Sequence, residues 1–363
     1  MKKFYILTVI ILTTIVNRVS AQIYLNGSAS YQLNIEGEMG RTSSGCGDED
    51  GLREINVIRS NGILQNVFSR RVVNDPFAST PLNYTKSNGI ESIHVKKMIT
   101  WSNWRTIFWG FIAIPSWECI GGPISRENSY RVINQCSNNS YYNQGDGLNR
   151  ITISSKPVIN IPLPTNPLYL TDTNYLTVTI PDNIDNKYFK WKYSVGGSYP
   201  RDIPYSYNYK PILRIKGSDF LSEEDFGKNV SVWIDLKNVC SYCENPSPIN
   251  FVYQKSLPHI IKQSLSLTSC YDTNDGKITL YFDRDLVEEE TLSFSITRNG
   301  QPYTLENRYR NIIRLDSNRT CTIENLPKGN YKLRMYGKYK GKASYSPYSN
   351  TDYNFFHWKS TSC

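Results

Sequence analysis

Side chains able to do acid–base or nucleophilic chemistry follow no catalytic pattern in this sequence. The three histidines, His94, His259 and His357, lie far apart, and none begins an HExxH zinc motif. Neither a GxSxG nucleophile elbow nor a GxxxxGK[ST] phosphate loop occurs. His94 lies between two apolar residues, so we expect a solvated histidine on the polar face of a strand. We predict a protein that is not an enzyme, with no catalytic, cofactor-binding or metal-ligating residues.

Carboxylates are more numerous, and a pair about 5 to 10 Å apart could hydrolyse glycosides without a histidine. Two acidic runs, residues 223–225 and 288–290, fall in predicted turns, where we expect them to solvate the surface. Residues 48–51 and 272–276 carry oxygen ligands of the kind that calcium prefers. The second loop lacks the glutamate that ends an EF-hand loop, and Asx-type turns explain both. Glycoside hydrolysis and calcium binding remain the alternatives.

Eight cysteines are present, and in an exported chain an even number is typical of disulfides whose pairing the sequence does not fix. Cys240-Ser-Tyr-Cys243 is the only CxxC sequence. It has no second pair or nearby histidine to complete a zinc site. It also follows a predicted strand instead of opening a helix, as a thioredoxin-like site would. We therefore predict a small disulfide loop between Cys240 and Cys243.

The first residues have the layout of a secretory signal peptide. Lys2 and Lys3 precede an apolar run over residues 4–16, and small residues follow as far as Ala21. The run is about half of the roughly 20 residues that span a bilayer. We predict a signal peptide over residues 1–21, no membrane span in the mature chain, and a protein that is secreted or held on the outer surface of a bacterium.

The charge of the chain is mildly basic. Loss of Lys2, Lys3 and Arg18 with the signal peptide would lower the formal net charge from +9 to +6. The densest basic segment, residues 328–342, alternates with apolar residues, as expected of a strand with one buried and one solvated face. No nucleic-acid partner is therefore predicted. The alternative is a basic patch that meets anionic polysaccharide or the cell envelope.

Alternation of apolar and polar residues dominates the mature chain and predicts strands. Twenty-seven tyrosines and many β-branched residues agree with this prediction. Residues 220–226 are the one short exception and are predicted to form a single helical turn. The predicted fold class is all-β, with tandem immunoglobulin-like β-sandwich domains after the signal peptide. The clearest runs place apolar residues at Leu176, Val178 and Ile180, at Val230, Val232 and Ile234, and at Ile278, Leu280 and Phe282.

Domain boundaries are predicted from composition and spacing. Residues 22–155 form an N-terminal β-sandwich domain, and four prolines then mark a linker over residues 156–168. Residues 169–259 form an immunoglobulin-like domain with Trp191 facing inward from a central strand. Residues 260–359 form a third sandwich. Residues 360–363 begin a further repeat, because the tripeptide Thr-Ser-Cys at 268–270 recurs 93 residues later.

Two local features refine this prediction. Asn61-Gly62 and Asn299-Gly300 are each flanked by apolar residues and predict hairpin turns. A dense aromatic segment in the first domain is predicted to fill its core, and stacking on sugar rings is the alternative. Its tryptophans are Trp101, Trp104, Trp109 and Trp117.

Two turns of the third domain carry a resemblance to a known family. Cys270 is followed by Asn274-Asp275-Gly276-Lys277-Ile278, and residues 326–331 read Leu-Pro-Lys-Gly-Asn-Tyr before a strand. With these turns the domain resembles the SprB-like repeats of surface adhesins in gliding bacteria, which are immunoglobulin-like. The resemblance covers the last quarter of the chain. It implies a long protein carried out by type IX secretion that acts in adhesion or gliding motility, although this chain is shorter and has no recognisable C-terminal sorting domain.

Taken together, the sequence predicts an exported noncatalytic cell-surface protein, an adhesin or stalk segment built of β-sandwich modules. The alternative is an ancillary noncatalytic region of a secreted polysaccharide-degrading enzyme. The expected partner is a surface polysaccharide or another surface protein.

Overall fold

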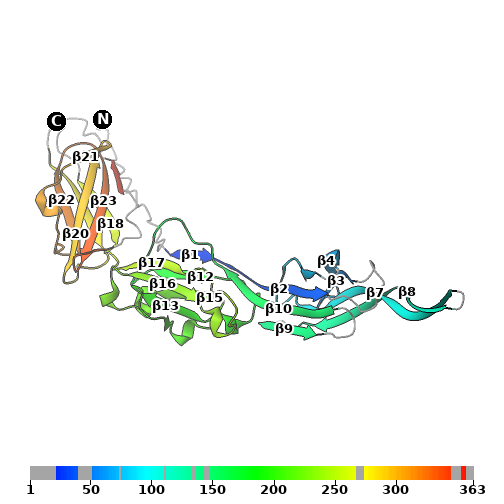
Figure 1. Ribbon diagram of the computed structural model, residues 1–363. Helices are drawn as coiled ribbons and strands as arrows, with labels where there is room; N and C mark the ends of the chain where they lie inside the picture. Colours follow the sequence, from blue (N-terminus) through cyan, green and yellow to red (C-terminus); the bar gives the residue numbers. More distant parts are fainter. Residues whose placement is uncertain are drawn as a thin grey trace, which may run out of the picture.

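The computed structural model describes residues 22–39, 51–72, 75–109, 112–132, 136–142, 148–266, 274–344 and 353–356. The predicted signal peptide, His357 and residues 360–363 lie outside these ranges, as do Cys46, Cys270, Cys363, residues 48–50 of the first candidate calcium loop and residues 272–273 of the second. Within them the chain forms three modules of two packed sheets each, arranged in a row (Figure 1). All helical segments of the described residues are single 3-10 turns, none of which could cross a membrane. The predicted all-β fold of tandem β-sandwiches is confirmed.

Module one comprises residues 28–160. One sheet has the order β5-β2-β10-β9 with β6 also paired to β2, and the other has the order β4-β3-β7-β8. The predicted hairpin at Asn61-Gly62 joins β3 to β4, and Gly62 takes the positive φ of 81° that this turn requires. The strands are β2 (Ser28–Met39), β3 (Gly51–Arg59), β4 (Leu64–Val72), β5 (Pro76–Ala78), β6 (Leu82–Tyr84), β7 (Ile90–Trp109), β8 (Ile112–Arg131), β9 (Ser137–Tyr142) and β10 (Leu148–Asn160).

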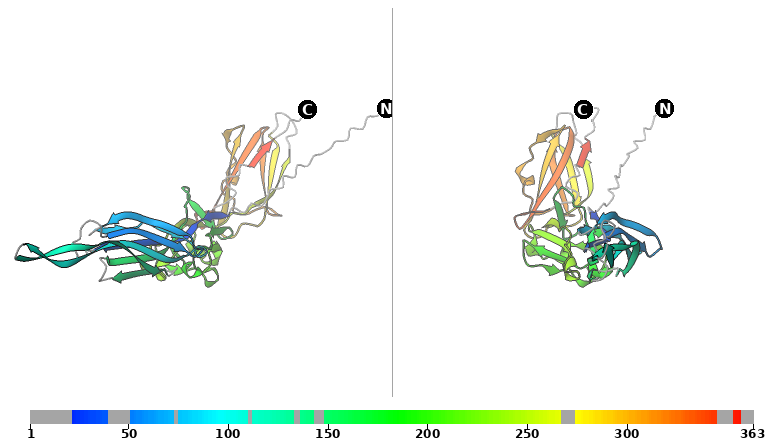
Figure 2. Two further views of the ribbon diagram at one scale, coloured as in Figure 1. Left: turned by 90° about the vertical axis from the view of Figure 1, so that its right-hand side faces the viewer. Right: turned by 45° about the vertical axis from the view of Figure 1, so that its right-hand side comes forward.

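A two-stranded arm projects from module one. β3 pairs with β7 only from Ile90 to Met98, whereas β7 and β8 stay paired as far as Trp109 and Ile112. Figure 2 shows this ribbon extending away from the rest of the molecule. The tryptophans predicted to fill the core all belong to β7 and β8 beyond Met98, and their side chains lie outside the described residues.

Module two comprises residues 23–26 and 168–254. Its sheets have the orders β1-β12-β15 and β11-β17-β16-β13-β14. Trp191 is fully buried on β13 between β16 and β14, as predicted for a central inward aromatic. The strands are β1 (Ile23–Asn26), β11 (Leu168–Thr171), β12 (Tyr175–Thr179), β13 (Trp191–Val195), β14 (Arg201–Asp202), β15 (Ile212–Lys216), β16 (Asn229–Ile234) and β17 (Ile249–Gln254).

The structure differs from the predicted domain boundaries in two places. β1 falls within the predicted N-terminal domain of residues 22–155 but pairs in parallel with β12 of module two, where Leu25 is buried. β10 extends through the first residues of the predicted linker over residues 156–168. Pro157 is accepted in β10 because β9 ends opposite Ser155, so that beyond this point one side of β10 pairs with no strand of the described residues. The proline content of a segment therefore does not by itself show where a strand ends and a linker begins.

Module three comprises residues 260–356. Its sheets have the orders β18-β19-β22 and β21-β20-β23-β24, with β25 also paired to β23. The predicted turn Asn299-Gly300 joins β20 to β21, with φ of 50° and 82° at its two residues. The strands are β18 (Ile260–Ser266), β19 (Gly276–Phe282), β20 (Glu290–Arg298), β21 (Gln301–Tyr303), β22 (Thr320–Leu326), β23 (Asn330–Tyr339), β24 (Lys342–Ser344) and β25 (Tyr353–Phe356).

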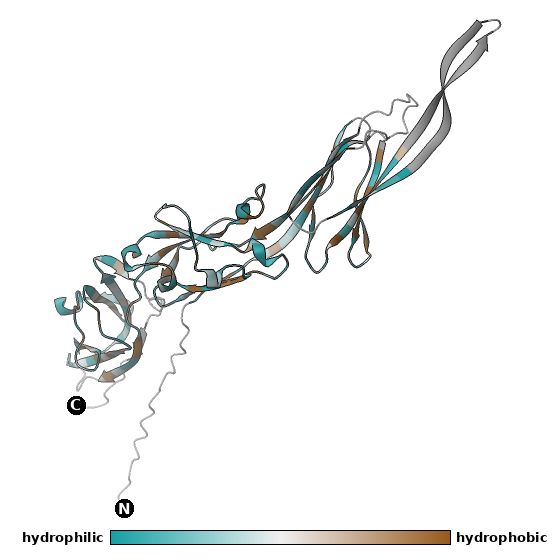
Figure 3. Ribbon diagram, turned by 90° about the horizontal axis from the view of Figure 1, so that it is seen from below, coloured by the Kyte–Doolittle hydropathy of each residue, from teal (hydrophilic) through white to brown (hydrophobic). Residues whose placement is uncertain are grey.

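The hydrophobic cores show which modules fold as one unit. A single cluster of buried side chains runs through modules one and two, whereas module three has a cluster of its own. Apolar and polar residues alternate along the strands that enclose these cores (Figure 3). Modules one and two therefore share a core, and module three is joined to them through a smaller contact.

Candidate binding groove and module junctions

A groove of about 470 Å³ lies on module three beside β20 and β23. Three exposed residues of β23, namely Arg334, Tyr336 and Lys338, line it. Strand register places Tyr336 opposite Ser293 and Lys338 opposite Thr291 on β20, and both of these partners also line the groove.

Alternation along β23 explains why these three side chains share one face. Leu333 and Met335 are buried in the core of module three, so their neighbours in sequence must point to solvent. The sequence prediction of one buried and one solvated face for this segment is confirmed. A third cation, Arg310, reaches the groove from the loop that follows the 3-10 turn η6 (Asn307–Tyr309). Ile312 anchors that loop through paired backbone hydrogen bonds of 2.7 and 2.8 Å with Leu292.

The groove is positively charged. Arg310, Arg334 and Lys338 are the charged residues among the twelve that line it, and none of the twelve is acidic. Guanidinium groups offer planar pairs of donors that match carboxylate and sulfate groups. Tyr336, whose side chain is 47% exposed, adds a flat apolar ring beside these cations. Cations next to an exposed ring suit a ligand that combines negative charge with sugar rings.

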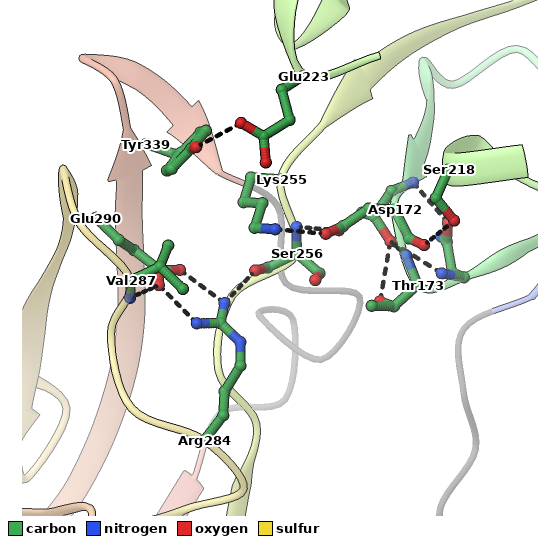
Figure 4. A network of polar contacts seen from close by, with 12 residues as sticks. Asp172, Thr173, Ser218, Glu223, Lys255, Ser256, Arg284, Val287, Glu290 and Tyr339 are labelled. Carbon is green, nitrogen blue, oxygen red and sulfur yellow. Dashed lines mark hydrogen bonds and ion pairs between the residues drawn. The ribbon is translucent and has the colours of Figure 1, made fainter. Parts of the chain in front are cut away.

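Figure 4 shows the polar network that joins modules two and three. Asp172, just after β11, accepts hydrogen bonds from Lys255 Nζ at 2.7 Å and from the Ser256 backbone N–H at 2.9 Å. Arg284 of module three donates to the Ser256 carbonyl oxygen at 2.7 Å. The connecting residue Ser256 is thus held from both modules at once.

Glu290 completes this network and corrects a prediction. Arg284 donates to its two carboxylate oxygens at 2.6 and 2.8 Å, and the Val287 backbone N–H donates at 3.0 Å. The Glu290 side chain is 0% exposed, so the prediction that residues 288–290 solvate the surface is wrong for this residue. Burial alone would lower the pKa of Arg284, but the hydrogen bonds and charge of Glu290 outweigh it and raise that pKa.

A second set of contacts closes the same junction. Tyr339 of β23 packs with the core of modules one and two, and its ring meets that of Phe226 edge-on at 5.6 Å between centroids. The Tyr339 hydroxyl donates to Glu223 at 3.0 Å, and Lys342 Nζ donates to the Phe226 carbonyl at 2.5 Å. Glu223 belongs to the 3-10 turn η4 (Glu223–Asp225), which confirms the predicted helical turn.

Modules one and two meet at a cluster of buried tyrosines. The Tyr31 ring stacks on Tyr84 at 5.2 Å between centroids and meets Tyr188 edge-on at 6.0 Å. Tyr84 and Ser155 hydroxyls lie 2.5 Å apart, and Tyr242 of module two donates to the Ser155 carbonyl at 2.9 Å. Both modules therefore contribute rings and hydroxyl groups to one dense contact.

Raising the pH above 10 is expected to weaken this tyrosine contact. Burial raises the pKa of Tyr84 to about 12, against the opposing hydrogen bond from Ser155, and burial also raises the pKa of Tyr242 to about 12. The stabilisation by neutral phenols is therefore complete below pH 10 and is lost as the pH rises from 10 to 12. The melting temperature of modules one and two should fall in this window. This fall in melting temperature should be smaller in Tyr84→Phe. In Tyr199→Phe it should equal that of the wild type, because the Tyr199 ring is 92% exposed.

Three cysteines meet beside this tyrosine contact. Cys240 lies within bonding distance of Cys243, as predicted, and also of Cys136 from module one. Sequence reasoning missed Cys136, since no spacing rule relates residues 104 apart. Cys321 of module three is free and buried, and burial raises its thiol pKa to about 12, so the predicted disulfides do not include it. The side chain of Cys119 lies outside the described residues.

The two histidines that the structure describes, His94 and His259, lie far apart along the row of modules. His94 lies in module one, where its Nδ1 is 2.5 Å from a carboxylate oxygen of Glu127 and its Nε2 is 3.0 Å from the Ser92 hydroxyl. Its side chain is 24% exposed and lies between the buried residues Ile93 and Val95, so it is on the polar face of the strand but only partly solvated. His259 lies directly before β18 of module three, and its backbone N–H donates to Asp283 at 2.8 Å.

Comparison with known proteins identifies no family for this chain. No family model and no curated protein matches the chain. Among solved structures it is similar to the chicken CNTN1 FN1-FN3 domains, with 11% identity, a TM-score of 0.24, and coverage of 85% of this chain and 96% of that one. It is also similar to the N-terminal four Ig domains of Dscam1 isoform 6.44, with 12% identity, a TM-score of 0.18, and coverage of 90% and 74%. The sheets themselves define the class, a protein of tandem β-sandwich modules.

Proposed function

We propose that this chain is an exported, noncatalytic surface protein, an adhesin or stalk segment, whose third module binds an anionic polysaccharide. The observation that carries the proposal is the groove of module three, whose described lining presents three cations and an exposed tyrosine and includes no carboxylate. Uronic acid or sulfated sugars combine the negative charge and the flat ring faces that such a groove would hold.

The arrangement of the modules supports a stalk or adhesin. Modules one and two share a core, and Asp172, Arg284 and Glu290 hold module three through buried and half-buried polar groups. The arm of module one and the body of module three lie at opposite ends of the row (Figure 1). A row of β-sandwiches with tight junctions keeps its binding surfaces at fixed distances from one another, which is what a surface stalk requires.

Export and the SprB-like character of module three belong to the same proposal. The signal-peptide layout of residues 1–21 and the two turns near Cys270 and Leu326 support them. A role in gliding motility follows from that resemblance. The groove would serve equally well in the alternative, an ancillary carbohydrate-binding region of a polysaccharide-degrading enzyme.

Binding of purified residues 22–363 to polygalacturonate and to neutral dextran tests the proposal. We expect binding to polygalacturonate alone, with affinity that falls as salt increases, because charged contacts are screened. The double variant Arg310→Ser/Arg334→Ser should weaken binding about tenfold, which corresponds to about 1.4 kcal/mol. Lys332→Ser is the matched control, since Lys332 is exposed on the same strand and does not line the groove.

Three outcomes would contradict the proposal. Equal binding of dextran and polygalacturonate would show that the groove does not select a ligand by its charge. Unchanged binding in the double arginine variant would show the same. Preferential binding of a nucleic acid or of another surface protein would show that the ligand is not an anionic polysaccharide. Release of reducing sugars by the purified chain would show that it is an enzyme.

A further inference from the structure

Cys136, Cys240 and Cys243 form a sulfur cluster at the junction of modules one and two. Their three Sγ atoms all lie within 4.8 Å of one another. Cys240 is within bonding distance of both partners, with Cα–Cα distances of 5.7 Å to Cys136 and 5.4 Å to Cys243, both usual for disulfides. A sulfur in a disulfide bonds to one other sulfur only. The cluster therefore contains two mutually exclusive disulfides and always leaves one cysteine over.

The two bonds have different consequences for the chain. Cys136 lies directly before β9 of module one, whereas Cys240 and Cys243 follow the 3-10 turn η5 (Leu236–Asn238) of module two. The Cys136–Cys240 bond would cross-link two modules and close a loop of separation 104. The Cys240–Cys243 bond would close a local loop of separation 3 and leave the modules without a covalent link at this point.

We propose that this cluster is an exchangeable disulfide, in which Cys240 alternates between an intermodule bond to Cys136 and a local bond to Cys243. In the forward step the Cys243 thiolate attacks Cys240 Sγ, a new S–S bond forms, and Cys136 leaves as a thiolate. Cys243 gives up a proton before the attack, and Cys136 takes one up afterwards. The number of disulfides is unchanged, so the exchange itself needs no oxidant. Forming the first bond from two thiols releases two electrons and two protons, which a small-molecule disulfide would accept as it is reduced to two thiols.

Contacts around the cluster hold the three residues together in either state. The Cys136 backbone N–H donates to the Tyr188 hydroxyl of module two at 2.9 Å. Tyr242, which lies between the two cysteines of the CxxC sequence, donates in the opposite direction to Ser155 of module one. These hydrogen bonds do not involve sulfur, so the junction can keep its geometry while the disulfide changes partner.

Burial makes the two states distinguishable by thiol chemistry. Cys240 and Cys243 are 1% and 2% exposed, whereas Cys136 is partly exposed. With the intermodule bond in place, the remaining thiol is the buried Cys243, which a reagent in solution reaches poorly. With the local bond in place, the remaining thiol belongs to the partly exposed Cys136, which the reagent reaches more readily. The exchange would therefore present or conceal a reactive thiol at a module junction.

Disulfide mapping of residues 22–363 tests the proposal. The reduced protein is oxidised with oxidised glutathione, held at several pH values, quenched with acid, alkylated, and digested without reduction for mass spectrometry. We expect both the Cys136–Cys240 and the Cys240–Cys243 peptides in the wild type. Their ratio should relax to one equilibrium value, at a rate that rises roughly tenfold per pH unit below the thiol pKa, since the thiolate is the attacking species. Cys243→Ser should give only the first peptide, and Cys136→Ser only the second.

Alkylation of the folded protein with maleimide gives the second readout. Cys136 should be labelled in proportion to the local disulfide, and Cys321→Ser should leave that labelling unchanged. A single wild-type disulfide that does not redistribute between pH 6 and 9 would overturn the proposal. So would reduced protein that binds one equivalent of zinc through these cysteines and forms no disulfide, because the cluster would then be a metal site. The wild-type measurements suffice if a variant fails to fold, and none of them depends on binding of a polysaccharide.

Discussion

Replacing Trp191 with alanine is expected to lower the free energy of unfolding of modules one and two by about 3 to 5 kcal/mol. Trp191 is the largest fully buried side chain of the described residues, and β13 places it in the core that modules one and two share. Its indole N–H also donates to the Lys210 carbonyl at 3.3 Å. Truncation would remove this apolar surface and leave a cavity that the paired strands on both sides cannot fill.

Differential scanning calorimetry and urea denaturation would measure this effect. Because modules one and two share a core, we expect them to unfold in one transition that is separate from that of module three. Trp191→Ala should shift the first transition and leave the second nearly unchanged. Tyr199→Ala is the matched control, since its 92% exposed ring should change stability by no more than about 0.5 kcal/mol. Equal shifts in both transitions would contradict the division of the cores.

Replacing Glu290 with glutamine should have the second largest effect, on module three. The substitution keeps the shape of the side chain but leaves the Arg284 guanidinium without its counter-charge. Breaking a buried ion pair by removing one partner costs about 3 to 5 kcal/mol. We expect the free energy of unfolding of module three to fall by about 3 kcal/mol, because the Arg284 side chain is 31% exposed and water can partly compensate its charge.

Glu288→Gln is the control for this substitution, because Glu288 is exposed two residues earlier in the same acidic run. It should leave both calorimetric transitions in place. Glu290→Gln should also loosen the contact between modules two and three, since Arg284 is the residue that holds the Ser256 carbonyl. Faster proteolysis between residues 254 and 260 would report this loosening. A Glu290→Gln protein as stable as wild type would show that the buried charge is dispensable.

Together these two residues show how the row of modules is stabilised. The shared core of modules one and two depends on apolar burial, as at Trp191. The contact of module three with module two depends more on polar groups, with Asp172 and Arg284 converging on Ser256. Burial of apolar area is insensitive to salt, whereas half-buried ion pairs are partly screened. The second junction is therefore the one that salt concentration can adjust.

Strand assignment was the part of this structure that the sequence predicted well. Side chains alternate across a strand with a period of two, so a buried face appears directly in the order of residues. Leu333 and Met335 are buried and Arg334 is exposed, as their alternation indicated. Turns were equally readable, because Asn299 and Gly300 adopt positive φ at low cost.

Contacts between residues distant in sequence could not be read in this way. Glu290 belongs to an acidic run that is typical of a surface turn. Its burial is explained only by the ion pair with Arg284. β1 pairs with β12 of module two although all of module one lies between them in the sequence, and no local pattern predicts such a pairing.

The sequence by itself determined the all-β class and the buried faces of its strands, because both depend on local chain geometry. Tertiary structure alone decided that modules one and two share a core, that Arg310 and Lys338 line one groove, and that Cys136 meets Cys240. These depend on how sheets pack, and packing brings together residues whose separation along the chain carries no periodic signal.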